Sequence, residues 1–149
     1  MSKKQSNGKA ALNFNTSWSY SPAPETADHI QLKNQYDLFI NGKWTKPSGG
    51  KYFDTINPAT EKKIASIAEA SASDVDKAVS AARAAADKVW GKMKGSERAK
   101  YIYRIARIMQ EKARELSIIE SMDGGKAIRE SRDVDVPLAA AHFFYYAGW

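Results

Sequence analysis

The stretch Tyr-Asp-Leu-Phe-Ile-Asn-Gly-Lys-Trp-Thr, residues 36–45, decides how the fold begins. Aromatic and branched side chains, which favour extended backbone, stand on both sides of the dipeptide Asn41-Gly42. Asn and Gly tolerate the positive φ angles that a two-residue type I′ turn requires. The stretch therefore predicts a strand, a tight turn and a returning strand.

Two further strand-like segments follow this hairpin. Residues 51–57 alternate in polarity and contain β-prone side chains, and Pro58 ends the run. Residues 64–68 form another short apolar run. Strands that are close in sequence usually pair with their neighbours. We expect all of these strands to form one small antiparallel sheet.

The next segments have a helical period of hydrophobic residues. Val75 and Val79 begin an apolar stripe that predicts a helix over about residues 73–90. Ser73, with Asp76 three residues later, gives this helix a weak capping box at its start. The change from strand to helix periodicity places the chain in the α/β class.

Two more helices are predicted in the last third of the chain. A long apolar stripe indicates a helix over about residues 96–122, and the pair Gly124-Gly125 is a strong stop signal. A third helix is predicted over about 135–149, with Pro137 tolerated in its first turn.

The third helix is apolar on nearly every side. A helix of this kind has to be buried all round, and each large side chain gains about 1.5–3 kcal/mol from burial. The short predicted sheet is too small to cover the whole helix. We therefore expect that further protein packs on these helices.

Composition narrows the possible functions. The 149 residues contain no Cys, so the chain has no thiol that could attack a carbonyl. A net charge of +6 would permit binding to nucleic acid, but acidic residues are mixed among the basic ones, as on an ordinary solvated helix face. Residues 1–35 are predicted to form a flexible arm. They show neither a secretory signal nor a membrane span. We therefore expect a cytoplasmic protein with no nucleic-acid or membrane partner.

Several motifs, taken in order, resemble the beginning of the aldehyde dehydrogenase superfamily. The stretches that carry the resemblance are Leu-Phe-Ile-Asn-Gly-Lys-Trp (38–44), Asp-Thr-Ile-Asn-Pro-Ala-Thr-Glu (54–61), Asp-Val-Asp-Lys-Ala-Val (74–79), Ala-Ala-Arg-Ala-Ala (81–85), Glu-Ser-Met-Asp-Gly-Gly-Lys (120–126), Arg-Glu-Ser-Arg-Asp-Val-Asp (129–135) and Phe-Tyr-Tyr-Ala-Gly-Trp (144–149). The resemblance covers about residues 18–149. It implies that residues 36–149 are part of an NAD-binding domain, in which short antiparallel β-hairpins precede long helices that pack on a Rossmann-like sheet absent from this chain.

The resemblance also implies a function for an intact protein. Such a protein would oxidise an aldehyde to a carboxylic acid with NAD or NADP, through a cysteine nucleophile and a general-base glutamate, and would form a homo-oligomer. The parts of the family pattern that hold those catalytic and cofactor-binding residues are not matched here. We therefore expect the chain alone to be inactive and to bind no dinucleotide tightly.

Two sets of site residues follow from the resemblance. It places ligands of a structural monovalent cation at Thr55, the carbonyl of Ile56, and Asp123, and oxygen donors suit a hard cation. It places Val134 and Leu138 at the mouth of the substrate tunnel. An alternative remains open, in which the chain is a non-catalytic interaction module that binds a partner through exposed apolar helices.

Overall fold

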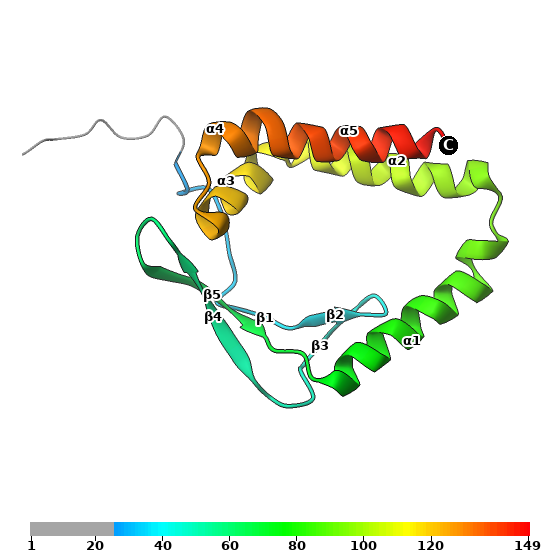
Figure 1. Ribbon diagram of the computed structural model, residues 1–149, viewed down its shortest axis with the longest axis horizontal. Helices are drawn as coiled ribbons and strands as arrows, with labels where there is room; N and C mark the ends of the chain where they lie inside the picture. Colours follow the sequence, from blue (N-terminus) through cyan, green and yellow to red (C-terminus); the bar gives the residue numbers. More distant parts are fainter. Residues whose placement is uncertain (1–25) are drawn as a thin grey trace, which may run out of the picture.

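The computed structural model describes residues 26–149, and its elements follow the order strands first, helices second (Figure 1). Most of the arm predicted for residues 1–35 lies outside the described residues. The strands are β1 (Gln35–Tyr36), β2 (Leu38–Ile40), β3 (Lys43–Thr45), β4 (Tyr52–Asn57) and β5 (Lys62–Ala68). The helices are α1 (Ala72–Lys88), the 3₁₀ turn η1 (Trp90–Lys92), α2 (Gly95–Glu111), α3 (Ala113–Gly124), α4 (Ile128–Glu130), the π-helical η2 (Ser131–Asp135) and α5 (Val136–Ala147). The α/β class predicted from the sequence is confirmed.

The hairpin predicted around Asn41-Gly42 is present. Strand β2 pairs with β3 in antiparallel register, with Ile40 opposite Lys43. Asn41 has φ 51° and Gly42 has φ 76°, so both turn residues take the positive φ that a type I′ turn needs.

The prediction of one antiparallel sheet is wrong. The strands form two sheets, β2–β3 and a three-stranded sheet in the order β1-β5-β4, and β1 runs parallel to β5. The segment predicted as one strand is interrupted at Asp37, a residue type that strands disfavour. The Asp37 carboxylate instead accepts a hydrogen bond from the Tyr52 hydroxyl at 2.7 Å. The interruption leaves β1 free to pair with β5, while β2 turns into its own hairpin.

The N-cap of helix α1 lies two residues earlier than predicted, and the helix ends at Lys88. Its N-cap is Ser71, whose side chain accepts from the backbone N–H of Asp74, and the Asp74 carboxylate accepts from the backbone N–H of Ser71. The pattern Ser-x-x-Asp occurs twice here, since Ser73 and Asp76 have the same spacing. The prediction of Ser73 as the cap is therefore wrong. Local spacing does not distinguish the two serines, but the hydrogen bonds between Asp74 and Ser48 favour Ser71.

The helix predicted over residues 96–122 is two helices with a break at Lys112. Lys112 has φ −104° and ψ 15°, outside helical values, although neither Gly nor Pro is near it in sequence. Helix α2 packs along α5, and α3 packs on β4 and η2 (Figure 1). We attribute the break to this difference in packing partners between α2 and α3.

The helical region predicted to begin near residue 135 begins at Ile128. It contains one π-helical segment, η2, before α5. In a π-turn the backbone N–H groups bond to carbonyls five residues earlier in the chain, in place of the four residues of an α-helix. The Ser117 hydroxyl of α3 donates to the Ala113 carbonyl of its own helix at 2.7 Å and also lies 3.4 Å from the Ser131 carbonyl in η2, and both serines are buried. Contact with α3 thus accompanies the irregular turn that the sequence pattern did not predict.

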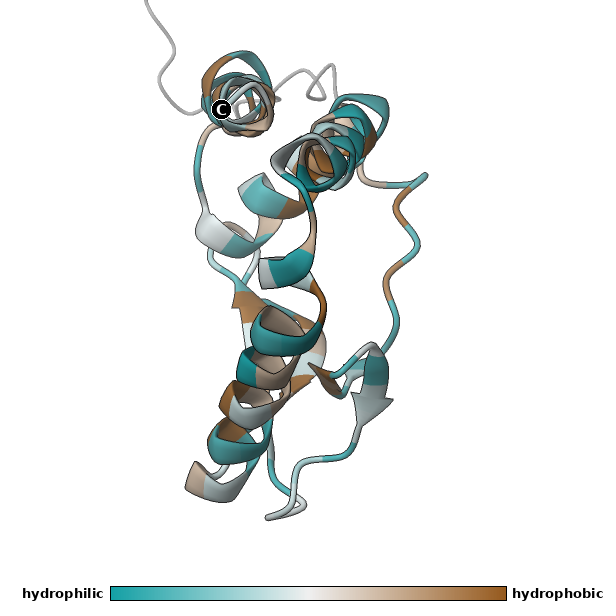
Figure 2. Ribbon diagram, turned by 90° about the vertical axis from the view of Figure 1, so that its right-hand side faces the viewer, coloured by the Kyte–Doolittle hydropathy of each residue, from teal (hydrophilic) through white to brown (hydrophobic). Residues whose placement is uncertain are grey.

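The core is small for a chain of this length. Its buried apolar residues are Ala65, Ala68, Ala106, Ile118, Val136 and Ala140. Figure 2 shows hydrophobic residues distributed along the helices and strands, and many large apolar side chains are exposed. On α5 these include Leu138, Tyr145 and Tyr146. The exposure agrees with the expectation that the apolar final helix is not covered by the short strands.

Candidate functional site

The structure brings together two of the residues assigned to a cation site. Thr55 lies on β4, and Asp123 lies in the last turn of α3, 68 residues later. The Thr55 hydroxyl donates a hydrogen bond to the Asp123 carboxylate. This contact joins the sheet to the end of α3, and it places a hydroxyl and a carboxylate oxygen side by side.

A cavity of about 550 Å³ opens beside this pair, between the three-stranded sheet and α3. Apart from Thr55 and Asp123, its lining is mainly apolar. The other lining residues are Leu32, Tyr36, Phe53, Ile64, Ala65, Ile67, Ile119 and Met122. Thr55 and Asp123 are therefore polar groups at a largely apolar surface.

Ile56, the third assigned ligand, follows Thr55 at an irregular point of the sheet. The register of β4 on β5 shifts between Thr55 and Ile56, because Thr55 is opposite Ala65 while Ile56 is opposite Lys63. Bulges of this kind redirect backbone and side-chain groups locally. Among residues 26–149, no three His, Cys, Asp or Glu side chains converge as a metal cluster. The donors at this place are thus one carboxylate with neutral oxygens.

The end of α3 is held by a close glycine contact. Gly125 has φ +68°, the left-handed conformation of a helix C-cap, which confirms the stop predicted at the glycine pair. A Cβ at Gly125 would lie 2.7 Å from Cγ of Pro58. The proline that ends β4 therefore packs on the residue that ends α3, two positions from Asp123. No local sequence pattern predicts this contact, because Pro58 and Gly125 are 67 residues apart.

Lys126 holds the loop after α3 to the next helical region. Its Nζ lies 2.6 Å from the Asp135 carboxylate and 3.9 Å from that of Glu120. The hydrogen bond to Asp135 raises the pKa of Lys126 above its ordinary value. The lysine is fully charged at neutral pH, and its role here is to bridge α3 and η2.

Val134 and Leu138, assigned to a tunnel mouth, lie one helical turn apart. Val134 is 48% exposed in η2 and Leu138 is 53% exposed in α5. Side chains four residues apart share a helix face. Neither residue lines the cavity beside Thr55. The structure thus presents the pair as part of an exposed apolar face.

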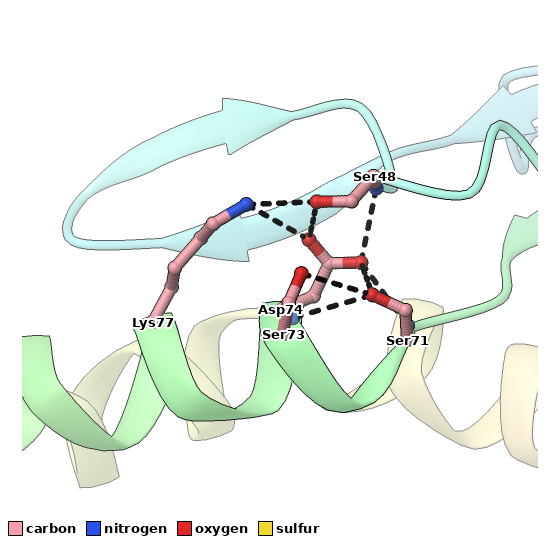
Figure 3. Close-up of polar contacts among 5 residues, drawn as sticks. All are labelled: Ser48, Ser71, Ser73, Asp74 and Lys77. Carbon is pink, nitrogen blue, oxygen red and sulfur yellow. Dashed lines mark hydrogen bonds and ion pairs between the residues drawn. The ribbon is translucent and has the colours of Figure 1, made fainter.

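A polar cluster that the sequence did not predict connects α1 to the loop after β3 (Figure 3). Asp74 is only 2% exposed, and its carboxylate accepts hydrogen bonds from the Ser48 hydroxyl and from the Ser48 backbone N–H at 3.0 Å. It also accepts from the Ser71 hydroxyl at 2.8 Å. Lys77 approaches from the next turn, with Nζ 2.7 Å from the Ser48 hydroxyl and 3.5 Å from the carboxylate.

These donors keep Asp74 ionised. The Ser48 hydroxyl, together with the backbone N–H groups of Ser71 and Ser48, holds the pKa of the Asp74 carboxyl well below its ordinary value, against the opposing effect of desolvation. The hydrogen bonds of this cluster tie α1 to the loop after β3, which suits a structural role. The signal that could have revealed it is the Ser71-x-x-Asp74 capping pattern.

None of the helices described over residues 26–149 is both long and apolar enough to cross a membrane.

Comparison with known proteins gives consistent matches. The sequence model of the aldehyde dehydrogenase family matches residues 44–149. An aldehyde dehydrogenase of Rhodospirillum rubrum is 44% identical over 126 residues, which is 84% of this chain and 25% of the relative. The fluoroacetaldehyde dehydrogenase of Streptantibioticus cattleyicolor is 42% identical over 119 residues, which is 80% of this chain and 23% of that enzyme.

A solved structure supports the same grouping. The NAD⁺ complex of aldehyde dehydrogenase from Bacillus cereus superposes with a TM-score of 0.75 at 39% sequence identity, over 80% of this chain and 26% of the other. The chain spans about a quarter of the length of the relatives it matches. Because the family model covers most of the sequence and the fold agrees as well, the chain belongs to the aldehyde dehydrogenase family.

Proposed function

We propose that this chain is the amino-terminal scaffold of an NAD- or NADP-dependent aldehyde dehydrogenase, which oxidises an aldehyde to a carboxylic acid. The observation that carries the proposal is the 44% identity to an aldehyde dehydrogenase over 84% of the chain. In this proposal residues 36–149 are part of the NAD-binding domain, and their exposed apolar helices pack on the dinucleotide-binding sheet of the same enzyme.

The chain by itself does not turn over aldehyde in this proposal. It contains no Cys, so it cannot form a covalent thiol adduct of an aldehyde. The polar clusters around Asp74 and Lys126 are occupied by internal hydrogen bonds and ion pairs, which suits a structural role. Tight binding of NAD or NADP and assembly into a homo-oligomer require the rest of the enzyme. The location that we expect is the cytoplasm.

Thr55, the Ile56 carbonyl and Asp123 would hold a structural monovalent cation. The donor set fits, because a hard cation prefers oxygen ligands, and Thr55 and Asp123 already lie within hydrogen-bonding contact. Entry of a cation would replace this hydrogen bond, and water or the remaining polypeptide would complete the shell. If the proposal is correct, K⁺ or Na⁺ raises the melting temperature above that in tetramethylammonium chloride, and Asp123→Asn removes the difference.

Val134 and Leu138 would form one wall of the aldehyde channel. Their support is that both are apolar, exposed and on one helix face. The opposite wall would come from the remaining three quarters of the enzyme. Replacing Leu138 with Phe in the assembled enzyme should then raise KM for bulky aldehydes more than for acetaldehyde.

The decisive experiment is a chimera. The first quarter of the Rhodospirillum rubrum enzyme is replaced with residues 26–149 of this chain, and aldehyde-dependent reduction of NAD is followed by absorbance. We expect the chimera to be active, and both the 149-residue chain and the truncated relative to be inactive when assayed alone. A chimera that folds as a soluble enzyme without activity contradicts the scaffold proposal, and so does turnover by the chain alone.

The exposed apolar residues also support a second candidate, a non-catalytic interaction module. A large exposed apolar surface indicates either a binding site for a partner or an incomplete hydrophobic core. The two candidates differ in their partner: the scaffold should bind the truncated relative in a mixing experiment and restore its activity. A stable complex with another protein, but not with the truncated dehydrogenase, would favour the module.

A further inference from the structure

Helices α2 and α5 lie side by side (Figure 1). An open groove lies on the surface that the two helices form. The groove has a volume of about 730 Å³ and is separate in its lining residues from the cavity beside Thr55. Its lining combines small and aromatic residues with basic ones. The residues are Ala99, Lys100, Tyr103, Arg104, Arg107, Phe144, Ala147 and Gly148.

Three cations follow one edge of this groove. Lys100, Arg104 and Arg107 are four and three residues apart, so they share one face of α2 and span about 10 Å along its axis. Among the residues that the structure describes, none of those that line the groove carries a carboxylate. Lys100 is paired with Glu97 at 2.8 Å and Arg107 lies 3.9 Å from Glu111. Within residues 26–149, Arg104 has no ion-pair or hydrogen-bond partner, which leaves its guanidinium available.

The floor of the groove is aromatic. Tyr103 of α2 and Phe144 of α5 meet edge to face, with ring centroids 5.0 Å apart. Tyr103 is more than half exposed, so its ring presents apolar surface to the groove. Ala99, Ala147 and Gly148 also line the groove, and their side chains are small or missing. An occupant would therefore gain apolar contacts on the floor and ion pairs along the edge.

We propose that this groove binds an acidic amphipathic helix of a protein partner, with carboxylates facing Arg104 and its neighbours and apolar side chains on the Tyr103–Phe144 floor. Carboxylates at positions i, i+4 and i+7 of a helix repeat the spacing of the cations on α2. The proposal concerns a surface outside the cation site and tunnel residues and does not depend on them.

The arrangement favours a short acidic helix over nucleic acid. Glu97 and Glu111 lie at the two ends of the cation row, where they limit the positive surface to about two helical turns. A nucleic-acid strand extends past both ends and would bring phosphates near these carboxylates. A helix with only a few acidic residues avoids that repulsion.

The test uses a fluorescein-labelled helical peptide of about 16 residues, long enough to form a helix, with Glu at three positions spaced four and three apart and Leu on the same face. Binding to the 149-residue chain is measured by fluorescence anisotropy. We expect saturable binding that weakens with salt, and we expect Arg104→Glu to weaken it about tenfold or more.

Arg83→Glu is the matched control, since Arg83 is an exposed arginine of α1 outside the groove and the charge change is the same. It should change the affinity less than about twofold, and circular dichroism should show both variants folded. The proposal is overturned if a peptide with Gln in place of Glu binds equally well, or if the two variants behave alike. It is also overturned if a single-stranded oligonucleotide of equal charge displaces the peptide at a lower concentration than the unlabelled peptide does.

Discussion

Helices α1 and α3 have similar sequence patterns but different surroundings. Both are amphipathic, and both follow directly from apolar periodicity. In α3, Ile118 is 4% exposed, and the helix packs on β4 and η2. In α1, Val79 is 52% exposed, and the helix is joined to the rest of the described chain mainly at its first turn, through Asp74 and Ser48.

The comparison separates two ways of holding a helix. Helix α3 is held by buried apolar surface, whereas α1 is held by a buried polar tie while its apolar face is open. An amphipathic pattern thus reports which face favours burial, without reporting whether a covering element is present. The following experiments probe this difference, in order of decreasing expected effect.

The largest effect is expected for Ile118→Ala in α3. Removing a buried Ile side chain to Ala should lower the free energy of unfolding by about 3 kcal/mol, because it loses transfer energy and leaves a cavity. Val79→Ala in α1 should change it by less than about 0.5 kcal/mol, since that side chain is half exposed. Urea unfolding followed by circular dichroism measures both. Equal losses would show that α1 is buried as α3 is.

Gly125→Ala tests the end of α3. The positive φ and the close contact with Pro58 should make this substitution cost about 2 kcal/mol. Gly49→Ala is the control, because a Cβ there has open space and no positive φ is required. It should change the stability by less than about 0.5 kcal/mol in the same urea titration. A neutral Gly125→Ala would mean that the turn after α3 can rearrange.

Asp74→Asn tests the tie that holds α1, and its effect should depend on pH. The folded-state pKa of Asp74 lies below the ordinary value of 3.8, so its carboxylate stabilises the fold above that pH and loses this contribution as the pH falls below it. At pH 7 the variant should be less stable than the parent, and hydrogen exchange should rise in α1 first. The difference should shrink between about pH 5 and pH 3. A difference that stays constant with pH would exclude an ionised tie.

Ser71→Ala removes the N-cap of α1 and should cost about 1 kcal/mol. The loss should be smaller than that of Asp74→Asn at pH 7, because Asp74 also holds Ser48. Ser73→Ala, which removes the other serine at capping spacing, should change the stability by less than about 0.5 kcal/mol. Thermal unfolding measures the loss of stability in both variants. A larger loss for Ser73→Ala than for Ser71→Ala would show that Ser73 is the N-cap.

The candidate cation site shows how far sequence reasoning reached. Thr55 and Asp123 were named from family resemblance alone, because no local pattern connects residues 68 positions apart. The structure brings their side chains into contact, while binding of a cation there stays a proposal. Ser48, Asp74 and the Pro58–Gly125 contact were missed for the same reason: each joins segments that are distant in sequence.

The sequence by itself determined the features that depend on a few adjacent residues. Asn41-Gly42 dictates the hairpin turn, Gly125 ends α3, and the missing Cys removes thiol chemistry, since backbone preference and side-chain reactivity are properties of the residues themselves.

Only the tertiary structure decided between options that were locally equivalent. It paired β1 with β5 in parallel, selected Ser71 over Ser73 as the cap, and divided the long helix at Lys112. In each case the local free-energy difference is small, so contacts with distant segments determine which conformation is adopted.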